Sequence, residues 1–328
     1  MTQRAVPAGD VDYESTGTGY EQQRRSDPRI AQAILSALGD ASTVVNVGAG
    51  AGSYEPTDRY VLAVEPSAAM RARRRAVGAM PAIDASAQSL PLDDDAVDAA
   101  LAVLTIHQWG DALVGGLQEM RRVASGPVVI LTLDGTQLQD FWLNEYLPAR
   151  AQIERQRFPD IQSIRKELGG TRDFNPVPIP LDCSDGFVEA FYGRPESLLD
   201  PAVRAAQSAW QFLDQTEIDR GLTQLTDDLR SGSWDSRHGH LRETPTYTGP
   251  LALIIAAPED ECRPEHDRRT VSDRQTLASH RTWINHNLVV VANPHEQSDQ
   301  AELDRAWHQP SPVDEPVDDD HPVNPPVP

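Results

Sequence analysis

Three glycines follow an apolar run in the segment VVNVGAGAGSYE, and they fall at every second position: Gly48, Gly50 and Gly52. Because glycine has no side chain, its backbone can approach a ligand closely. The next apolar run, RYVLAVE, ends in Glu65, whose carboxylate could accept hydrogen bonds from two vicinal ribose hydroxyls. Such a turn alone would be weak evidence, but together with Glu65 it predicts that the chain binds a nucleoside.

The spacing of these glycines also separates two classes of nucleoside-binding protein. A dinucleotide-binding fingerprint reads G-x-G-x-x-G, whereas this turn reads G-x-G-x-G. The tighter repeat suits a ligand without a bulky pair of phosphates. The missing glycine therefore argues against an NAD-dependent oxidoreductase.

Composition excludes several further classes. The chain has 328 residues and a formal net charge of -21, and Lys166 is its one lysine. Such a charge repels phosphate backbones and anionic membrane surfaces, so we expect neither nucleic acid nor membrane partners. No apolar run approaches the roughly 18 residues of a membrane span, and we see no secretory signal. Two cysteines, Cys183 and Cys262, cannot form a disulfide framework or a Cys-rich zinc site, so we expect a cytoplasmic protein.

Residues 28–134 alternate between helical and strand-like patterns. Asp27 and Pro28 start a helical pattern that Gly39 ends, and Ser67 starts another that Gly78 ends. Between and after them run the apolar segments TVVNV, RYVLAVE, AVDAALAVL and PVVILTL, with the helical ALVGGLQEMRRVA before the last. This alternation predicts a doubly wound α/β domain with a parallel sheet, whose strand carboxyl ends form the ligand-binding edge.

The rest of the chain predicts a cap and a tail. Residues 138–168, 185–193, 201–211 and 214–231 have helical patterns, VPIPLDC is strand-like, and LALIIAA returns to close the sheet. We therefore divide the chain into three parts: 1–136, the cofactor half with an N-terminal lid helix; 137–258, an inserted helical cap with the last strands; and 259–328, an acidic, Pro-rich, disordered tail. The six tail histidines have irregular spacing, so we expect no metal site there.

Five segments carry a resemblance to a known family. VVNVGAGAGSYE, VLAVEPS, ASAQSLPLDDDAVDAAL, LTIHQWGD and LQEMRRVASGPVVILTL together resemble the class I S-adenosylmethionine-dependent methyltransferases. The chain is similar to the small-molecule branch, which includes ubiquinone/menaquinone-type and trans-aconitate methyltransferases, over about Tyr20 to Asp134. The resemblance implies a seven-stranded Rossmann-like sheet, S-adenosyl-L-methionine as cofactor and a small-molecule methyl acceptor.

The resemblance also assigns cofactor-binding residues. The positions that match the family's motifs are Tyr20, Arg25, Gly48, Ala49, Gly50, Gly52, Glu65, Pro66, Ser86, Ala87 and Gln88. Glu65 would hold the ribose hydroxyls, Tyr20 would close over the cofactor, and Arg25 would meet its carboxylate or else belong to a solvated basic face. The sequence departs from the family at two positions. Asn46 and Ser86 stand where relatives carry an acid, and Asp84 could replace Ser86 at the adenine.

His107 follows the fourth strand, in LTIHQWGD, and two interpretations stay open. As a catalytic residue it would orient or deprotonate the acceptor, since an ordinary histidine pKa of ~6.5 suits proton transfer. As a structural residue it would only pack or bond to the backbone. Trp109 is predicted to form a wall of the pocket.

Two weaker motifs complete the candidates. In SDGF, Ser184 or Asp185 is predicted to cap a helix rather than to bind a metal. The pair His238 and His240 could face one side of a strand or the substrate pocket, but two ligands do not make a metal site.

The preferred hypothesis is a methyltransferase that moves a methyl group to a small organic molecule by in-line displacement. The alternative is an inactive S-adenosylmethionine-binding protein that acts as a partner or regulator, which the departures at Asn46 and Ser86 keep open. A DNA amino-methyltransferase is disfavoured, because LTIHQW lacks the Asn/Asp-Pro-Pro-aromatic motif. The accepting atom and the oligomeric state stay open.

Overall fold

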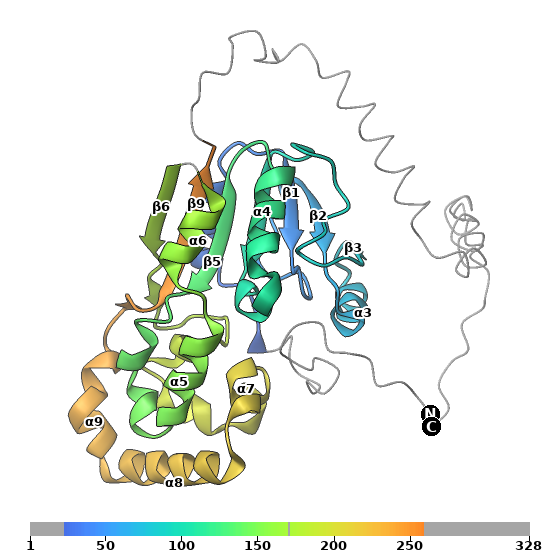
Figure 1. Cartoon of the computed structure of the whole chain (residues 1–328). Coiled ribbons are helices and arrows are strands. Elements are labelled where there is room, and N and C mark those ends of the chain that lie inside the picture. Colours follow the sequence, from blue (N-terminus) through green and yellow to red (C-terminus); the bar gives the residue numbers. More distant parts are fainter. Residues whose placement is uncertain (1–22, 170, 259–328) are drawn as a thin grey trace, which may run out of the picture. The chain divides into compact units, whose positions relative to one another are not determined.

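The computed structural model describes residues 23–169 and 171–258, which lie within a unit that ends at Asp260. In this part of the chain the strands form a seven-stranded sheet of order β3-β2-β1-β4-β5-β9-β6 (Figure 1). The strands are β1 Thr43–Val47, β2 Tyr60–Val64, β3 Ala82–Ile83, β4 Ala99–Val103, β5 Val128–Leu133, β6 Thr171–Pro176 and β9 Leu251–Ala257. The strands from β3 to β5 pair in parallel, and β9 is antiparallel to both neighbours. The predicted Rossmann-like α/β fold is confirmed.

The helices of the sheet domain begin where the sequence predicts. Asp27 accepts a hydrogen bond from the backbone of Arg29 and caps α2, Pro28–Leu38. Ser67 accepts one from the backbone of Met70 and caps α3, Ala68–Ala76. These caps satisfy amide groups that the first turn of a helix leaves free.

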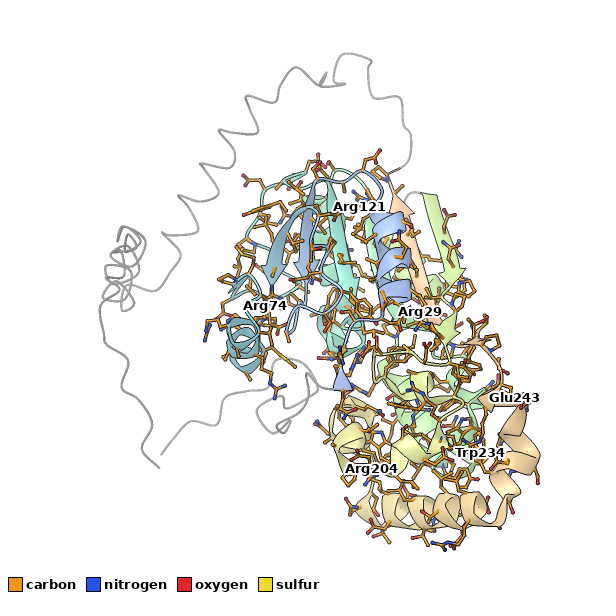
Figure 2. The ribbon with its side chains drawn as sticks, turned by 180° about the vertical axis from the view of Figure 1, so that it is seen from behind. Arg29, Arg74, Arg121, Arg204, Trp234 and Glu243 are labelled. Carbon is orange, nitrogen blue, oxygen red and sulfur yellow. The ribbon has the colours of Figure 1, made fainter. Side chains whose placement is uncertain are left out.

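Helices cover both faces of the sheet. Helix α4, Leu113–Val123, packs beside α6, Ile161–Leu168, on one face (Figure 1). Helix α2 covers the opposite face (Figure 2). With both faces covered, strands β1, β4 and β5 are almost completely buried, as their continuous apolar runs predict.

The cap lies beyond the carboxyl ends of the parallel strands (Figure 1). It consists of short helices and a two-stranded pair: η3 Leu138–Asp140, η4 Trp142–Glu145, α5 Pro148–Arg157, η5 Val188–Phe191, η6 Pro195–Leu199, α7 Pro201–Ala205, η7 Ser208–Phe212, α8 Gln215–Ser231, α9 Ser233–His238, η8 Gly239–Arg242, and β7 Ile179–Pro180 with β8 Thr246–Tyr247. Trp142, Tyr192 and Trp234 are buried at its centre, and the Trp142 indole donates to the Tyr192 carbonyl at 2.9 Å.

The cap differs from its prediction in three details. The helical pattern of 138–168 is divided into η3, η4, α5 and α6, because Pro148 begins α5 and Asp160 caps α6. The segment VPIPLDC pairs with β8 only over β7, since its prolines cannot donate to a strand ladder. Strand β6, which pairs with β9, was not predicted. Strand β6 therefore extends the sheet, and α6 covers one of its faces, although both belong to the segment 137–258. The division at 136/137 stays a prediction, and the predicted tail, 259–328, lies outside the described residues.

Asp185 joins three segments that are far apart in the chain. Its carboxylate is buried and accepts from Arg24 Nε at 2.7 Å and from the Tyr54 hydroxyl at 3.0 Å. Arg24 precedes α2, Tyr54 follows the glycine turn, and Asp185 belongs to the cap. A backbone bridge between Arg24 and Asp185 adds to the contact. We call this contact the Asp185 junction, and it ties the cap to the glycine-turn end of the sheet.

Neighbouring hydrogen bonds extend the Asp185 junction. The Asp27 carboxylate accepts from the Ser184 backbone at 3.1 Å, and the Tyr54 amide donates to Ser26 Oγ at 2.8 Å. Burial opposes ionisation of Asp27, but hydrogen bonds from Arg29 and the Ser184 backbone outweigh it and lower its pKa to about 2. Arg29 lies at the cap-facing end of α2 (Figure 2). The helix-cap interpretation of SDGF is therefore wrong, since η5 has no side-chain cap and Asp185 bonds to distant residues instead.

We predict that Asp185→Asn lowers the free energy of unfolding by about 2–4 kcal/mol, because it leaves a largely buried guanidinium without its anion. Urea unfolding measures this change. Asp182→Asn in the same loop is the matched control, since Asp182 is 82% exposed in its pair with Arg29. Its stability should stay close to that of the wild type. Equal losses in the two variants would contradict a special role for the junction.

Candidate active site

The glycine turn connects β1 to the loop that precedes β2. Its three glycines have positive φ angles, 69° at Gly48, 51° at Gly50 and 101° at Gly52. Other residues adopt such angles only with strain, which explains the glycine at each position. The amides of Gly48 and Ala49 donate to the Val64 carbonyl at 2.9 and 3.0 Å, so the turn folds against the end of β2.

Glu65 lies directly at the end of β2, beside the glycine turn. Its carboxylate accepts from the Gly50 amide and from the Ser67 amide, both at 2.8 Å. Burial raises the pKa of Glu65, while the two amides and the nearby Arg71 and Arg74 oppose that effect. The carboxylate is therefore fixed at the turn and can still accept hydrogen bonds from a ligand.

A buried ion pair supports the turn from behind. The Arg74 guanidinium, fully buried, donates to both carboxylate oxygens of Glu55 at 2.9 Å and to the Met80 carbonyl. Asn46 Nδ2 donates to the same Glu55 carboxylate at 2.9 Å. An acid at position 46 would repel Glu55, so the amide fits this network. Figure 2 shows Arg74 on α3, at the side of the sheet.

A cavity of about 260 Å³ lies between the glycine turn and the cap. Most of the predicted cofactor residues line it: Gly48, Ala49, Gly50, Glu65, Pro66, Ser86 and Ala87. The candidate catalytic His107 and the predicted wall residue Trp109 line it as well. The sequence therefore identified the sheet side of the cavity, although the function of each residue stays a prediction.

Three of the predicted residues that the structure describes do not line the cavity. Arg25 is exposed, and its neighbour Arg24 lines the cavity instead, through the pairing that the Asp185 junction imposes. Gln88 is exposed. Gly52 packs against the Glu55–Arg74 pair rather than the cavity, since a Cβ there would lie 3.2 Å from Arg74 Nη1. Tyr20 lies outside the described residues.

Asp84, the predicted replacement for Ser86 at the adenine, does not line the cavity. Its carboxylate is 68% exposed and pairs with Arg71 at 2.7 Å, while Ser86 itself lines the cavity. Asn46 also lines the cavity, and its Oδ1 is buried with no hydrogen-bond partner among the described residues. An acceptor is thus available at position 46, as the sequence predicts for an asparagine there.

His107 lies in η1, Ile106–Gln108, directly after β4. Its ring is buried and stacks on Phe158, with centroids 4.3 Å apart and an interplanar angle of 28°. Burial, and then the charges of Arg157 and Arg24, hold the pKa of His107 well below its ordinary value. The expectation of an ordinary histidine pKa is therefore wrong: the ring is neutral near pH 7 and a weak base.

The cap supplies the opposite wall of the cavity, which the sequence did not reveal. Charged side chains contribute to it from α5 and η5: Arg150, Glu154 and Glu189. Apolar side chains complete it, among them Phe158, Phe187 and Val188. Arg150 and Glu189 form an ion pair in which each side chain is 1% exposed. These residues come from two separate segments, α5 with Phe158 and the segment 187–189, which only tertiary packing brings together.

The other candidates do not converge on a metal site. Within residues 23–169 and 171–258, no group of three or more histidine, cysteine or acidic side chains could hold a metal ion. His238 pairs with Glu145 at 2.9 Å in the cap, away from the cavity. In the same described ranges, no helix is long and apolar enough to cross a membrane.

The chain matches a known family model and is similar to solved structures. The family model of a methyltransferase domain matches residues 45–129. A crystal structure from Anabaena variabilis, of a protein described as a methyltransferase from an antibiotic biosynthesis pathway, is 30% identical, with 72% of this chain and 99% of that chain covered and a TM-score of 0.65. Geranyl diphosphate C-methyltransferase from Streptomyces coelicolor, crystallised with Mg²⁺, geranyl-S-thiolodiphosphate and S-adenosyl-L-homocysteine, is 15% identical, with 70% and 75% covered and a TM-score of 0.38. No curated protein matches the chain.

We predict different defects from two neighbouring glycine substitutions. A Cβ at Gly48 would overlap Thr105 Oγ1, whereas a Cβ at Gly50 meets no atom within 4 Å and would enter the open cavity. Gly48→Ala should therefore lower the melting temperature more than Gly50→Ala. Gly50→Ala should instead weaken binding of S-adenosylhomocysteine by at least tenfold, as calorimetry can measure. Normal nucleoside binding by Gly50→Ala would contradict this placement of the ligand.

The low pKa of His107 predicts how stability depends on pH. Its folded-state pKa lies below its unfolded value, so below about pH 6.5 the unfolded chain binds a proton that the folded chain does not, and stability falls. His107→Phe removes this contribution. Between pH 7.5 and 5.5 the variant should lose less stability in urea unfolding than the wild type, by up to about 1.4 kcal/mol per pH unit below pH 6.5. If the free energies of unfolding of the variant and the wild type changed equally with pH, the pKa of His107 would not be lowered in the folded chain.

Proposed function

The chain belongs to the class I S-adenosylmethionine-dependent methyltransferases, and we propose that it transfers a methyl group to a small organic molecule in the cavity under the cap. One observation carries the proposal: the glycine turn with Glu65 faces the cap across a single cavity of about 260 Å³. The sheet side has the features of a nucleoside site, and side chains of the cap line the other side of the same cavity. The 30% identity to the Anabaena variabilis protein supports the assignment.

The sheet side fits S-adenosylmethionine, the cofactor of this family. The open space above Gly50 admits a ligand against the backbone, and Glu65 is fixed beside it as an acceptor for ribose hydroxyls. Asn46 Oδ1, buried and without a partner among the described residues, offers a further acceptor on the same side. When bound, the cofactor supplies a methyl group on a positively charged sulfur.

The residues around the cavity would act by positioning the acceptor against the methyl group. An in-line transfer needs the acceptor held close to the methyl group, and such proximity can contribute roughly 7–11 kcal/mol to lowering the barrier. The cap residues Phe158 and Phe187 border the cavity and exclude water from it. Because burial lowers the pKa of His107 and makes it a weak base, we assign it to orienting the acceptor through a hydrogen bond rather than to removing its proton.

An acceptor of small size is favoured by the cavity and by the charge. The cavity is bounded by side chains of the cap on one side and of the sheet on the other, which leaves little space for a polymer. The net charge of -21 also disfavours nucleic acid. No feature of the site favours the alternative of an inactive cofactor-binding protein.

The test is transfer of label from methyl-labelled S-adenosylmethionine to a metabolite extract. We expect label in small molecules and in neither protein nor nucleic acid. Glu65→Gln should weaken cofactor binding by roughly 1–3 kcal/mol, because a charged acceptor is lost. Asp84→Asn is the matched control and should bind normally, since Asp84 lies outside the cavity. Cofactor binding without any transfer would favour the inactive alternative, and binding of NAD instead would contradict the proposal.

A further inference from the structure

Helix α5 forms the wall of the cavity that faces His107. Arg150, Glu154 and Phe158 follow one another at four-residue spacing, which places them on one face of the helix and at its end, and all three line the cavity. The Phe158 ring stacks on the His107 ring. This stacking brings the charged face of α5 to the end of β4, where an acceptor would lie.

Buried ion pairs are concentrated around this part of the cavity. Arg150 pairs with Glu189, Arg157 with Glu154 at 3.4 Å, and Arg24 with Asp185 at 2.7 Å. In each pair the carboxylate side chain is no more than 6% exposed. Removing ion pairs from water is unfavourable, and an apolar acceptor would gain nothing from them. The wall is therefore suited to a polar acceptor.

Two nitrogen atoms from residues on opposite sides of this part of the cavity are buried and have no hydrogen-bond partner among the described residues. They are Arg150 Nε and His107 Nδ1. Arg150 Nε can only donate, so its missing partner must be an acceptor atom. Arg157 and Arg24 place positive charge near His107 and help to keep it neutral, and the same field favours an oxygen that carries negative charge.

Resting on the proposed function, we propose that the methyl acceptor carries a carboxylate group, which is held by Arg150 Nε and His107 Nδ1. The remainder of the acceptor packs against Phe158, Phe187 and Val188. A phosphate group is a poorer fit, because Glu154 and Glu189 line the same cavity and their partners Arg150 and Arg157 are already paired. The second negative charge of the phosphate would therefore be repelled.

Calorimetry on the full chain saturated with S-adenosylhomocysteine tests this proposal. The probes are two acids with their uncharged amides, benzoate with benzamide and hexanoate with hexanamide, together with inorganic phosphate. We expect at least one acid to bind tenfold or more tightly than its amide, and phosphate to compete weakly. Amides that bind as well as their acids, or phosphate that binds as tightly as the acids, would overturn the proposal.

A double variant locates the acid. Arg150→Met with Glu189→Leu replaces the whole ion pair by apolar side chains and leaves no unpaired charge. It should lose the preference for acid over amide. The control is Arg242→Met with Glu196→Leu and Asp235→Leu, which removes a cap ion pair outside the cavity together with the second carboxylate that Arg242 binds. A preference kept by the first double variant, or lost equally by both, would overturn the assignment.

A further measurement on the unmodified chain decides the case if the first double variant does not fold. Benzoate should shift the His107 Nδ1 resonance in ¹⁵N-histidine spectra, whereas benzamide should not; His107→Phe identifies the resonance. No shift with any acid would overturn the proposal. Failure of the proposed function is distinguishable, because it would appear as absent binding of S-adenosylhomocysteine or as absent methyl transfer in the labelling test, whichever acids bind.

Discussion

The structure of the site depends on one buried carboxylate, that of Asp185, which holds together three segments that are far apart in the sequence. Arg24 comes from the segment before α2, Tyr54 from the loop after the glycine turn, and Asp185 from the cap. Because both oxygens are engaged by different segments, the cap cannot shift without breaking a buried charged hydrogen bond. Two of the joined residues, Arg24 and Tyr54, also line the cavity between cap and sheet.

The two sides of the cavity are built in different ways. On the sheet side, positive φ angles at Gly48 and Gly50, and the Arg74–Glu55 pair behind them, fix a backbone surface with few side chains. On the cap side, Arg150 and Glu189 present buried charge instead. A nucleoside needs close backbone approach, and an acceptor needs recognition by side chains. The division of the cavity thus matches what the two proposed ligands require.

The sequence predicted the sheet side well and the cap side poorly, for physical reasons. Gly48 lies in a turn and Glu65 at the end of a strand, and short-range sequence patterns reveal both kinds of position. Arg24 and Arg25 are adjacent, so only the pairing with Asp185 decides which faces the cavity. Strand β6 exists because β9 pairs with it, and its sequence TRDFNP has little strand character. Likewise, the low pKa of His107 arises from burial under Phe158, which no local pattern encodes.

The central claim is that the cofactor lies on the glycine turn, with its ribose at Glu65 and the acceptor space between it and the cap. A crystal structure of the protein with S-adenosylhomocysteine tests this most directly. The account predicts the nucleoside against Gly48 and Gly50, both ribose hydroxyls within hydrogen-bond distance of Glu65, and the sulfur directed toward His107. A nucleoside bound elsewhere, or one whose ribose does not reach Glu65, would contradict it.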